Sequence, residues 1–139
     1  TSSWTVIDVS TRRMVHGSDV SNIVSPEWIC ADSVSDHQAD KIVIPKDLVQ
    51  EHVADRRVAY SDIDVVGHVN NARYVVWAMD CMDYDFIANH TLQEVNINFN
   101  QECKPGDVVS ISRCHQDGRW YVLGKVDGKQ MFAVEMLLR

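Results

Sequence analysis

The chain has 139 residues, 45% of them hydrophobic, which suffices for one domain with a buried core and is too short for two ordinary domains. The formal net charge of −7, from 20 acids against 13 Lys and Arg residues, argues against a duplex nucleic-acid interface, because phosphate contacts need concentrated basic side chains. Since no apolar run approaches the ~20 residues of a membrane-spanning helix, we expect a soluble protein without a membrane span.

The cysteines indicate a reducing compartment. They lack the C-x-x-C spacing of redox and zinc motifs, and a chain of this size does not need disulfide bonds for stability. We therefore expect free thiols and a cytoplasmic protein. The cysteines are Cys30, Cys81, Cys103 and Cys114.

The first third of the chain shows little regular pattern. Residues 4–9 have the composition of a strand, and Ser25 followed by Pro26 and Glu27 has the form of a helix start. The rest of residues 14–45 is rich in Ser and Asp, so we expect a connector with one or two short helical turns.

From position 46 the chain becomes organised. A short strand is expected at residues 56–61, and a helix is expected from Asn71 onward. Apolar side chains recur along this helix in a wide stripe, so we expect it to be buried on most of its circumference. The stripe consists of Tyr74, Val75, Trp77, Ala78, Met79, Cys81 and Met82.

The second half of the chain has the period-two pattern of strands, interrupted by turn residues. In residues 93–103 apolar side chains alternate with asparagines, and three further strands are expected after them, joined by two Asp-Gly hairpin turns. A buried helix followed by antiparallel strands predicts an α+β fold, with an antiparallel sheet wrapped around one long central helix. The later strands are expected at 108–113, 120–126 and 130–138, with the turns at Asp117-Gly118 and Asp127-Gly128.

Charged side chains are concentrated directly before the apolar helix, where Asp62, Asp64 and His68 lie within seven residues. Turn and helix-cap chemistry alone would explain these residue types. A catalytic role is favoured because the helix start suits a neutral imidazole, and because unpaired N–H groups there can hold a developing oxyanion. A carboxylate beside such a site, opening onto an apolar helix, suits attack on an acyl carbonyl.

The run Asp-x-Asp-x-x-Gly-His-Val-Asn-Asn-x-x-Tyr, residues 62–74, resembles the signature of hot-dog-fold acyl thioesterases. It is most similar to the C-terminal half of plant and bacterial-type fatty acyl-[acyl-carrier-protein] thioesterases, as are residues 100–107. The opening residues 1–13 resemble the late strand of the first of two repeats. The resemblance implies that residues 1–45 are the end of a preceding repeat plus a connector, and that residues 46–139 are a hot-dog thioesterase domain.

The resemblance also implies roles for individual residues. Asp64 is the principal carboxylate, acting as general base on water or as nucleophile, and His68 is its orienting and proton-handling partner. Glu102 is the second acid, which activates or positions water. Cys103 stands where a catalytic thiol has sometimes been assigned, but we rank it below Glu102 because a neighbouring acid disfavours a thiolate.

The remaining residues of the motif are expected to bind substrate or to support the loop and the core. We expect Gly67, Asn70 and Asn71 to contact substrate through the loop, the two asparagines acting mainly as cap and loop-fixing residues. Tyr74 is expected in the core. Val66 departs from the family, which commonly has an asparagine there, so one polar contact must be absent or come from elsewhere.

The activity implied by the resemblance is hydrolysis of fatty acyl thioesters, with release of free fatty acid. The substrate would be carried on acyl carrier protein or coenzyme A, its tail lying along the helix, and no cofactor or metal is needed. Acyl carrier protein is acidic, so docking is expected at Arg12-Arg13, at Arg56-Arg57 or on the other repeat. Pairing with a second hot-dog repeat or a homodimer is expected, and a plant protein would act in the plastid stroma.

Two other functions stay open. One is a non-catalytic acyl-binding or scaffold half of a tandem hot-dog protein, which Val66 favours. The other is a hot-dog dehydratase or isomerase acting on carrier-bound acyl chains, in which the thioester survives the reaction.

Overall fold

The structure is a computed structural model that describes residues 39–139 without a break and, before them, residues 2, 6–8, 10–11, 13–16, 25–28 and 32. It divides into two units, residues 1–40 and 41–139. In the first unit Ile7 forms an antiparallel bridge with Met14. The strand expected at 4–9 lies partly outside the described residues, and the helix start at Ser25 leads into a single 3-10 turn, η1 (Pro26–Trp28).

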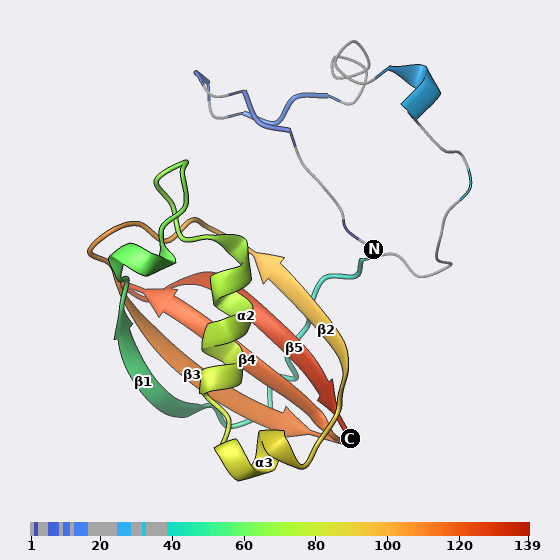
Figure 1. The fold of residues 1–139 in the computed structure, drawn as a ribbon, viewed down its shortest axis with the longest axis vertical. Coiled ribbons are helices and arrows are strands. Elements are labelled where there is room, and N and C mark those ends of the chain that lie inside the picture. Colours follow the sequence, from blue (N-terminus) through green and yellow to red (C-terminus); the bar gives the residue numbers. More distant parts are fainter. Residues whose placement is uncertain are drawn as a thin grey trace. The chain divides into compact units, whose positions relative to one another are not determined.

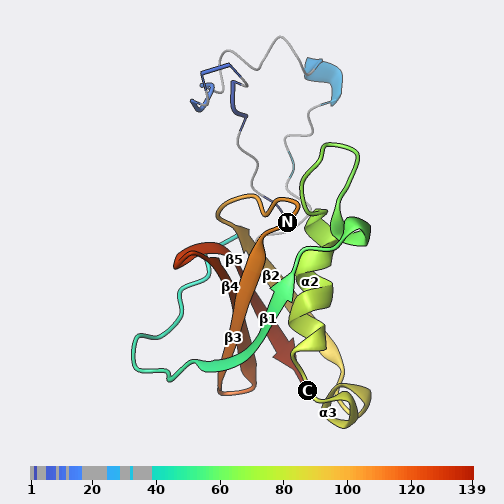
Figure 2. The ribbon, with the colours of Figure 1, turned by 90° about the vertical axis from the view of Figure 1, so that its left-hand side faces the viewer.

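The second unit is a five-stranded antiparallel sheet with α2 (Asn71–Asp80) lying across one face (Figures 1 and 2). The strand order is β1-β3-β4-β5-β2, so β1 and β2 form the two edges. This arrangement confirms the predicted α+β fold. The remaining elements are η2 (Tyr60–Asp62), α3 (Tyr84–Ala88), β1 (Glu51–Arg57), β2 (Leu92–Phe99), β3 (Val108–Gln116), β4 (Arg119–Val126) and β5 (Lys129–Leu138).

Both predicted hairpin turns are confirmed. Asp117 and Gly118 have φ values of 52° and 78°, and Asp127 and Gly128 have values of 49° and 77°. Two consecutive residues with positive φ match the right-handed twist of the flanking strands, which explains the Asp-Gly pairs. The strands β3, β4 and β5 therefore form a tightly connected meander.

The core lies between α2 and the sheet. Tyr74 and Trp77 point from the helix toward Phe132 on β5, with ring centroids of Tyr74 and Phe132 4.8 Å apart. Gly124 on β4 makes room for this packing, because a Cβ atom there would lie 2.1 Å from Cε1 of Phe132. The core thus depends on a strand glycine facing an aromatic ring.

Two features differ from the sequence prediction. The first strand covers 51–57 instead of 56–61, because it is largely exposed and its polar residues carry no period-two signal. The helix ends at Asp80 and is covered by the sheet on one side only, with Ala72 and Val76 exposed. The residues of the predicted apolar stripe are all buried or half-buried, whereas the exposed Ala72 and Val76 lie outside it, so the stripe identifies the covered side of the helix.

Candidate active site

A tight loop, residues 63–70, connects η2 to α2 and carries most of the motif. An antiparallel bridge between Ile63 and Val69 closes it, and the N–H of Asp64 donates to the carbonyl of His68 at 2.9 Å. Gly67 has a φ of 87°, a left-handed conformation that glycine adopts without strain. The loop backbone thus places Asp64 and His68 opposite each other.

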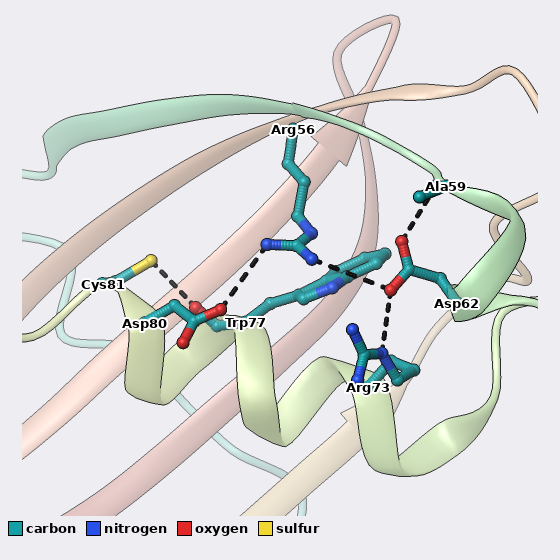
Figure 3. A network of polar contacts seen from close by, with 7 residues as sticks. All are labelled: Arg56, Ala59, Asp62, Arg73, Trp77, Asp80 and Cys81. Atoms are coloured by element: carbon teal, nitrogen blue, oxygen red, sulfur yellow. Dashed lines mark hydrogen bonds and ion pairs between the residues drawn. The ribbon is translucent and has the colours of Figure 1, made fainter.

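The buried carboxylate of Asp62 anchors the start of this loop (Figure 3). Its side chain is 0% exposed. It accepts the N–H of Ala59 at 2.9 Å and Nε–H of Arg73 at 2.8 Å, and it lies 3.7 Å from Nη2 of Arg56. Burial raises the pKa of Asp62, but the Ala59 N–H and the two guanidinium groups outweigh burial and hold that pKa below its ordinary value. The carbonyl of Asp62 also accepts the N–H of Asn70 at 2.8 Å, so both ends of the loop are joined.

Arg56 contacts Asp62, Asp80 and the Trp77 ring, so its guanidinium group is not free in solvent (Figure 3). Its Cζ lies 5.1 Å from the Trp77 ring centroid, and its Nη1 lies 3.5 Å from Oδ2 of Asp80. Of the pair expected to dock a carrier protein, Arg57 alone is exposed. In the other pair, Arg12 lies outside the described residues.

The expected catalytic side chains come together in part. Nε2 of His68 lies 3.3 Å from Oε2 of Glu102, with side chains 28% and 57% exposed. The Asp64 carboxylate accepts the N–H of Val66 at 2.9 Å, and in the described region it makes no side-chain bond to His68 or Glu102. The structure therefore pairs His68 with Glu102 and leaves Asp64 as a partly exposed acid on the same loop.

Cys103, the residue after Glu102, is buried and is held through its main chain. Its N–H donates to the hydroxyl of Tyr74 at 3.2 Å, and its carbonyl accepts the N–H of Val69 at 3.0 Å. Burial raises the pKa of the Cys103 thiol and the Asp107 carboxylate adds to this, whereas the contact with Tyr74 acts in the opposite direction. A buried, protonated thiol is a poor nucleophile, which favours ranking Cys103 below Glu102.

The N–H groups expected to hold a carbonyl oxygen are mostly occupied. Those of Gly67, Val69 and Asn70 donate to backbone carbonyls. The side chain of Asn70 also accepts an N–H of the first helical turn at 2.9 Å, which confirms its predicted role as helix cap. The N–H groups of His68 and Asn71 have no protein acceptor within residues 39–139.

Aromatic rings fill the side of α2 that faces the sheet. The centroid of Tyr74 lies 5.3 Å from that of Trp77, and Trp77 lies 6.1 Å from Phe132. All three side chains are buried, as the sequence predicts for Tyr74. These rings fill the space between α2 and the sheet at this point, so an acyl tail on that side of the helix would have to displace them. The opposite side of α2 exposes Val76.

Two residues that shape the site were not predicted from the sequence. Arg73 on α2 pairs with Asp62 on η2, and no periodic pattern within one element relates residues of two different elements. The apolar stripe predicts that Tyr74 lies in the core, and its ring does. The stripe does not predict the hydrogen bond that the Tyr74 hydroxyl makes. Because the hydroxyl of a buried tyrosine usually makes a hydrogen bond, the predicted burial of Tyr74 indicates that its hydroxyl has a partner.

Three of the cysteines, Cys81, Cys103 and Cys114, are free thiols as expected, and Cys30 lies outside the described residues. Among the described residues, no group of three His, Cys, Asp or Glu side chains is placed to hold a metal ion. The helices of this part of the chain are all too short or too polar to cross a membrane.

Comparison with known proteins connects this domain to one enzyme family. Residues 45–131 match the family described as the acyl-ACP thioesterase C-terminal domain. A chloroplastic palmitoyl-acyl carrier protein thioesterase of Gossypium hirsutum is 29% identical over 105 residues, covering 74% of this chain and 25% of the relative. Oleoyl-acyl carrier protein thioesterase 1 of Arabidopsis thaliana, also chloroplastic, is 26% identical over 118 residues, covering 78% and 32%.

Solved structures give the same picture of the fold. An acyl-ACP thioesterase from Bacteroides thetaiotaomicron superposes with a TM-score of 0.77 at 22% identity, covering 96% of this chain and 53% of that one. The 12:0-ACP thioesterase from Umbellularia californica gives 0.80 at 20% identity, covering 96% and 52%. These likenesses show the predicted hot-dog fold. The chain spans about half of these structures and a quarter to a third of the curated relatives. Since the family match covers more than half of its residues, the chain belongs to the acyl-ACP thioesterase C-terminal domain family.

Proposed function

We propose that this chain supplies the catalytic groups of a thioesterase that hydrolyses fatty acyl-[acyl-carrier-protein] and releases free fatty acid. The observation that carries the proposal is the 3.3 Å approach of His68 to Glu102 beside the loop that holds Asp64. The names of the curated relatives support acyl carrier protein as the carrier. Acyl coenzyme A is the alternative carrier.

In the proposed reaction Asp64 accepts a proton from water as the water oxygen attacks the thioester carbon. A C–O bond forms, the C–S bond breaks, and His68, held by Glu102, passes a proton to the departing sulfur. The N–H groups of His68 and Asn71 stabilise the oxyanion of the tetrahedral intermediate. In the covalent variant the Asp64 carboxylate attacks first, and water then hydrolyses the resulting anhydride.

The acyl tail has to lie outside the packed space between α2 and the sheet. Exposed apolar side chains in this region are Val76 on α2 and Val65 and Val66 on the loop itself. We expect a second hot-dog repeat or a second copy of the domain to cover them, because an apolar surface left in water binds a tail weakly. The reaction would take place in the cytoplasm, or in the plastid stroma as the names of the plant relatives suggest.

The test is thiol release from a long-chain acyl thioester by the full-length protein before and after Asp64→Asn. We expect a loss of at least roughly 10²-fold in kcat/KM, since a catalytic acid or base contributes on that order. Asp83→Asn is the matched control, because Asp83 accepts an N–H two residues later at 2.9 Å, as Asp64 does, but does so at the start of α3. Unchanged turnover in Asp64→Asn would remove Asp64 from this role.

One observation favours a second candidate, the non-catalytic acyl-binding half of a tandem protein. Val66, where the family commonly has a polar donor, is 72% exposed and offers none. In that case the full-length protein would bind the acyl thioester and release thiol at the same rate with Asp64→Asn as without it. The two candidates therefore make opposite predictions for one measurement.

A further inference from the structure

The buried hydroxyl of Tyr74, on α2, contacts the backbone of Cys103, the residue that follows Glu102. Tyr74 is in the second turn of α2 and is 2% exposed. Its ring contacts Trp77 and Phe132, which fixes where the hydroxyl projects. Burial raises the pKa of Tyr74, so the hydroxyl stays protonated and neutral. It accepts the N–H of Cys103 at 3.2 Å.

The segment that carries Glu102 depends on few hydrogen bonds. It lies between β2 and β3, and just before it the N–H groups of Asn100 and Gln101 both donate to the carbonyl of Met131 on β5, at 2.8 and 3.0 Å. Among the described contacts, the backbone of residues 102–103 makes two hydrogen bonds. One is the N–H of Cys103 to Tyr74, and the other is the carbonyl of Cys103 to the N–H of Val69.

These two bonds join the segment of Glu102 to the loop of His68 and to α2. Val69 directly follows His68, and Cys103 directly follows Glu102, so the Val69–Cys103 bond sets the two segments side by side. Tyr74 holds the other side of Cys103 from the rigid helix. The result is the 3.3 Å approach of Nε2 of His68 to Oε2 of Glu102.

We propose that Tyr74 is a positioning residue, whose buried hydroxyl holds Cys103 so that Glu102 reaches His68. The inference rests on the proposed function where it concerns catalysis, since it assumes that the His68–Glu102 pair is used in thioester hydrolysis. A hydroxyl that serves stability alone would give a different result in the double variant described below.

The test compares Tyr74→Phe with Tyr121→Phe in the full-length protein. Tyr121 is the matched control, because it is also a buried tyrosine but its hydroxyl interacts with Glu135 in the sheet. For Tyr74→Phe we expect kcat to fall roughly tenfold with KM unchanged, since small displacements of catalytic groups are costly. Tyr121→Phe should leave both constants within about twofold.

The decisive measurement is Tyr74→Phe in a Glu102→Gln background. If Tyr74 acts through Glu102, the added substitution lowers the remaining kcat by less than about twofold, because the two effects are not additive. A further tenfold loss in that background, or no loss in the single variant, overturns the proposal.

A second readout does not require enzymatic activity. Hydrogen–deuterium exchange of the peptide that contains Cys103 should become roughly tenfold faster in Tyr74→Phe and stay unchanged in Tyr121→Phe. If the wild-type protein releases no thiol, the proposed function fails while this exchange result still decides whether Tyr74 holds the segment. Equal exchange in Tyr74→Phe and the wild type shows that it does not.

Discussion

Asp62 and Asp64 stand two residues apart in one motif and lie in opposite environments. Asp62 is fully buried and is held by one N–H and two guanidinium groups. Asp64 is partly exposed and accepts a single N–H from its own loop, that of Val66. A carboxylate with all its partners supplied by the protein suits an anchor, whereas one with acceptor capacity left for water suits proton transfer.

The two environments assign different roles to two acids that appear in the sequence as one cluster: Asp62 stabilises the loop, and Asp64 is available for proton transfer. Asp62 fixes the ends of the loop to α2, whereas the partly exposed Asp64 lies within the loop itself. The predictions below test this division of roles, beginning with the largest expected effect.

Asp62→Asn should lower the free energy of unfolding by about 2 to 3 kcal/mol. Removing one partner of a buried ion pair leaves the other charge uncompensated, and the partial exposure of Arg56 and Arg73 moderates the cost. Urea unfolding followed by circular dichroism measures it, with Asp83→Asn as an exposed control. A loss below about 0.5 kcal/mol, the range of ordinary surface substitutions, would contradict the role of Asp62 as anchor.

The same contribution should depend on pH. The pKa of Asp62 is lower in the folded protein than the ordinary value of 3.8, so the folded state binds this proton less tightly than the unfolded chain. The stabilisation is complete above that value and is lost as the pH falls below it, through the folded pKa. The gap in unfolding free energy between wild type and Asp62→Asn should be constant from about pH 5 to 7 and should shrink below about pH 4. A gap that stays constant down to about pH 2 would contradict this assignment.

Val66→Asn should raise kcat/KM roughly tenfold, by returning a polar donor to the tip of the loop beside Asp64. Val66 is exposed, so the substitution removes little buried apolar surface and should not change the unfolding midpoint. Val65→Asn is the control, because Val65 is the exposed neighbour with the same side chain. An equal gain in both variants would point to a general effect of loop polarity.

The smallest effect is expected for Asp64→Asn on stability, within about 0.5 kcal/mol. An asparagine oxygen can accept the same N–H of Val66, so the loop keeps its hydrogen bond. Urea unfolding beside Asp62→Asn compares one chemical change at two neighbouring positions. A loss at Asp64 as large as that at Asp62 would abolish the distinction between them.

Much of the fold could be predicted because local signals agreed with it. The Asp-Gly turns at 117–118 and 127–128 and the apolar stripe around Tyr74 and Trp77 each required one conformation. The strand at 51–57 was misplaced because its exposed, polar residues leave no periodic pattern.

The site was less predictable than the fold, for a physical reason. The motif supplied Asp64 and His68 because they are close in sequence, and the resemblance supplied Glu102. The hydrogen bonds that hold the surrounding segments, Asp62 to Arg73 and Cys103 to Tyr74, join groups that only the folded chain brings together. Hydrophobic patterns carry no information about such polar pairs.

The meander of β3, β4 and β5 has a consequence for the order of folding. Its strands are neighbours in sequence, so their pairing closes only short loops. The edge strand β1 must instead find β3 across most of the domain, with Glu51 pairing with Arg113. We therefore expect the sheet of β3, β4 and β5 to form before β1 joins it. The loop of residues 63–70, which lies between β1 and α2 in the chain, should be among the last segments to acquire its native conformation.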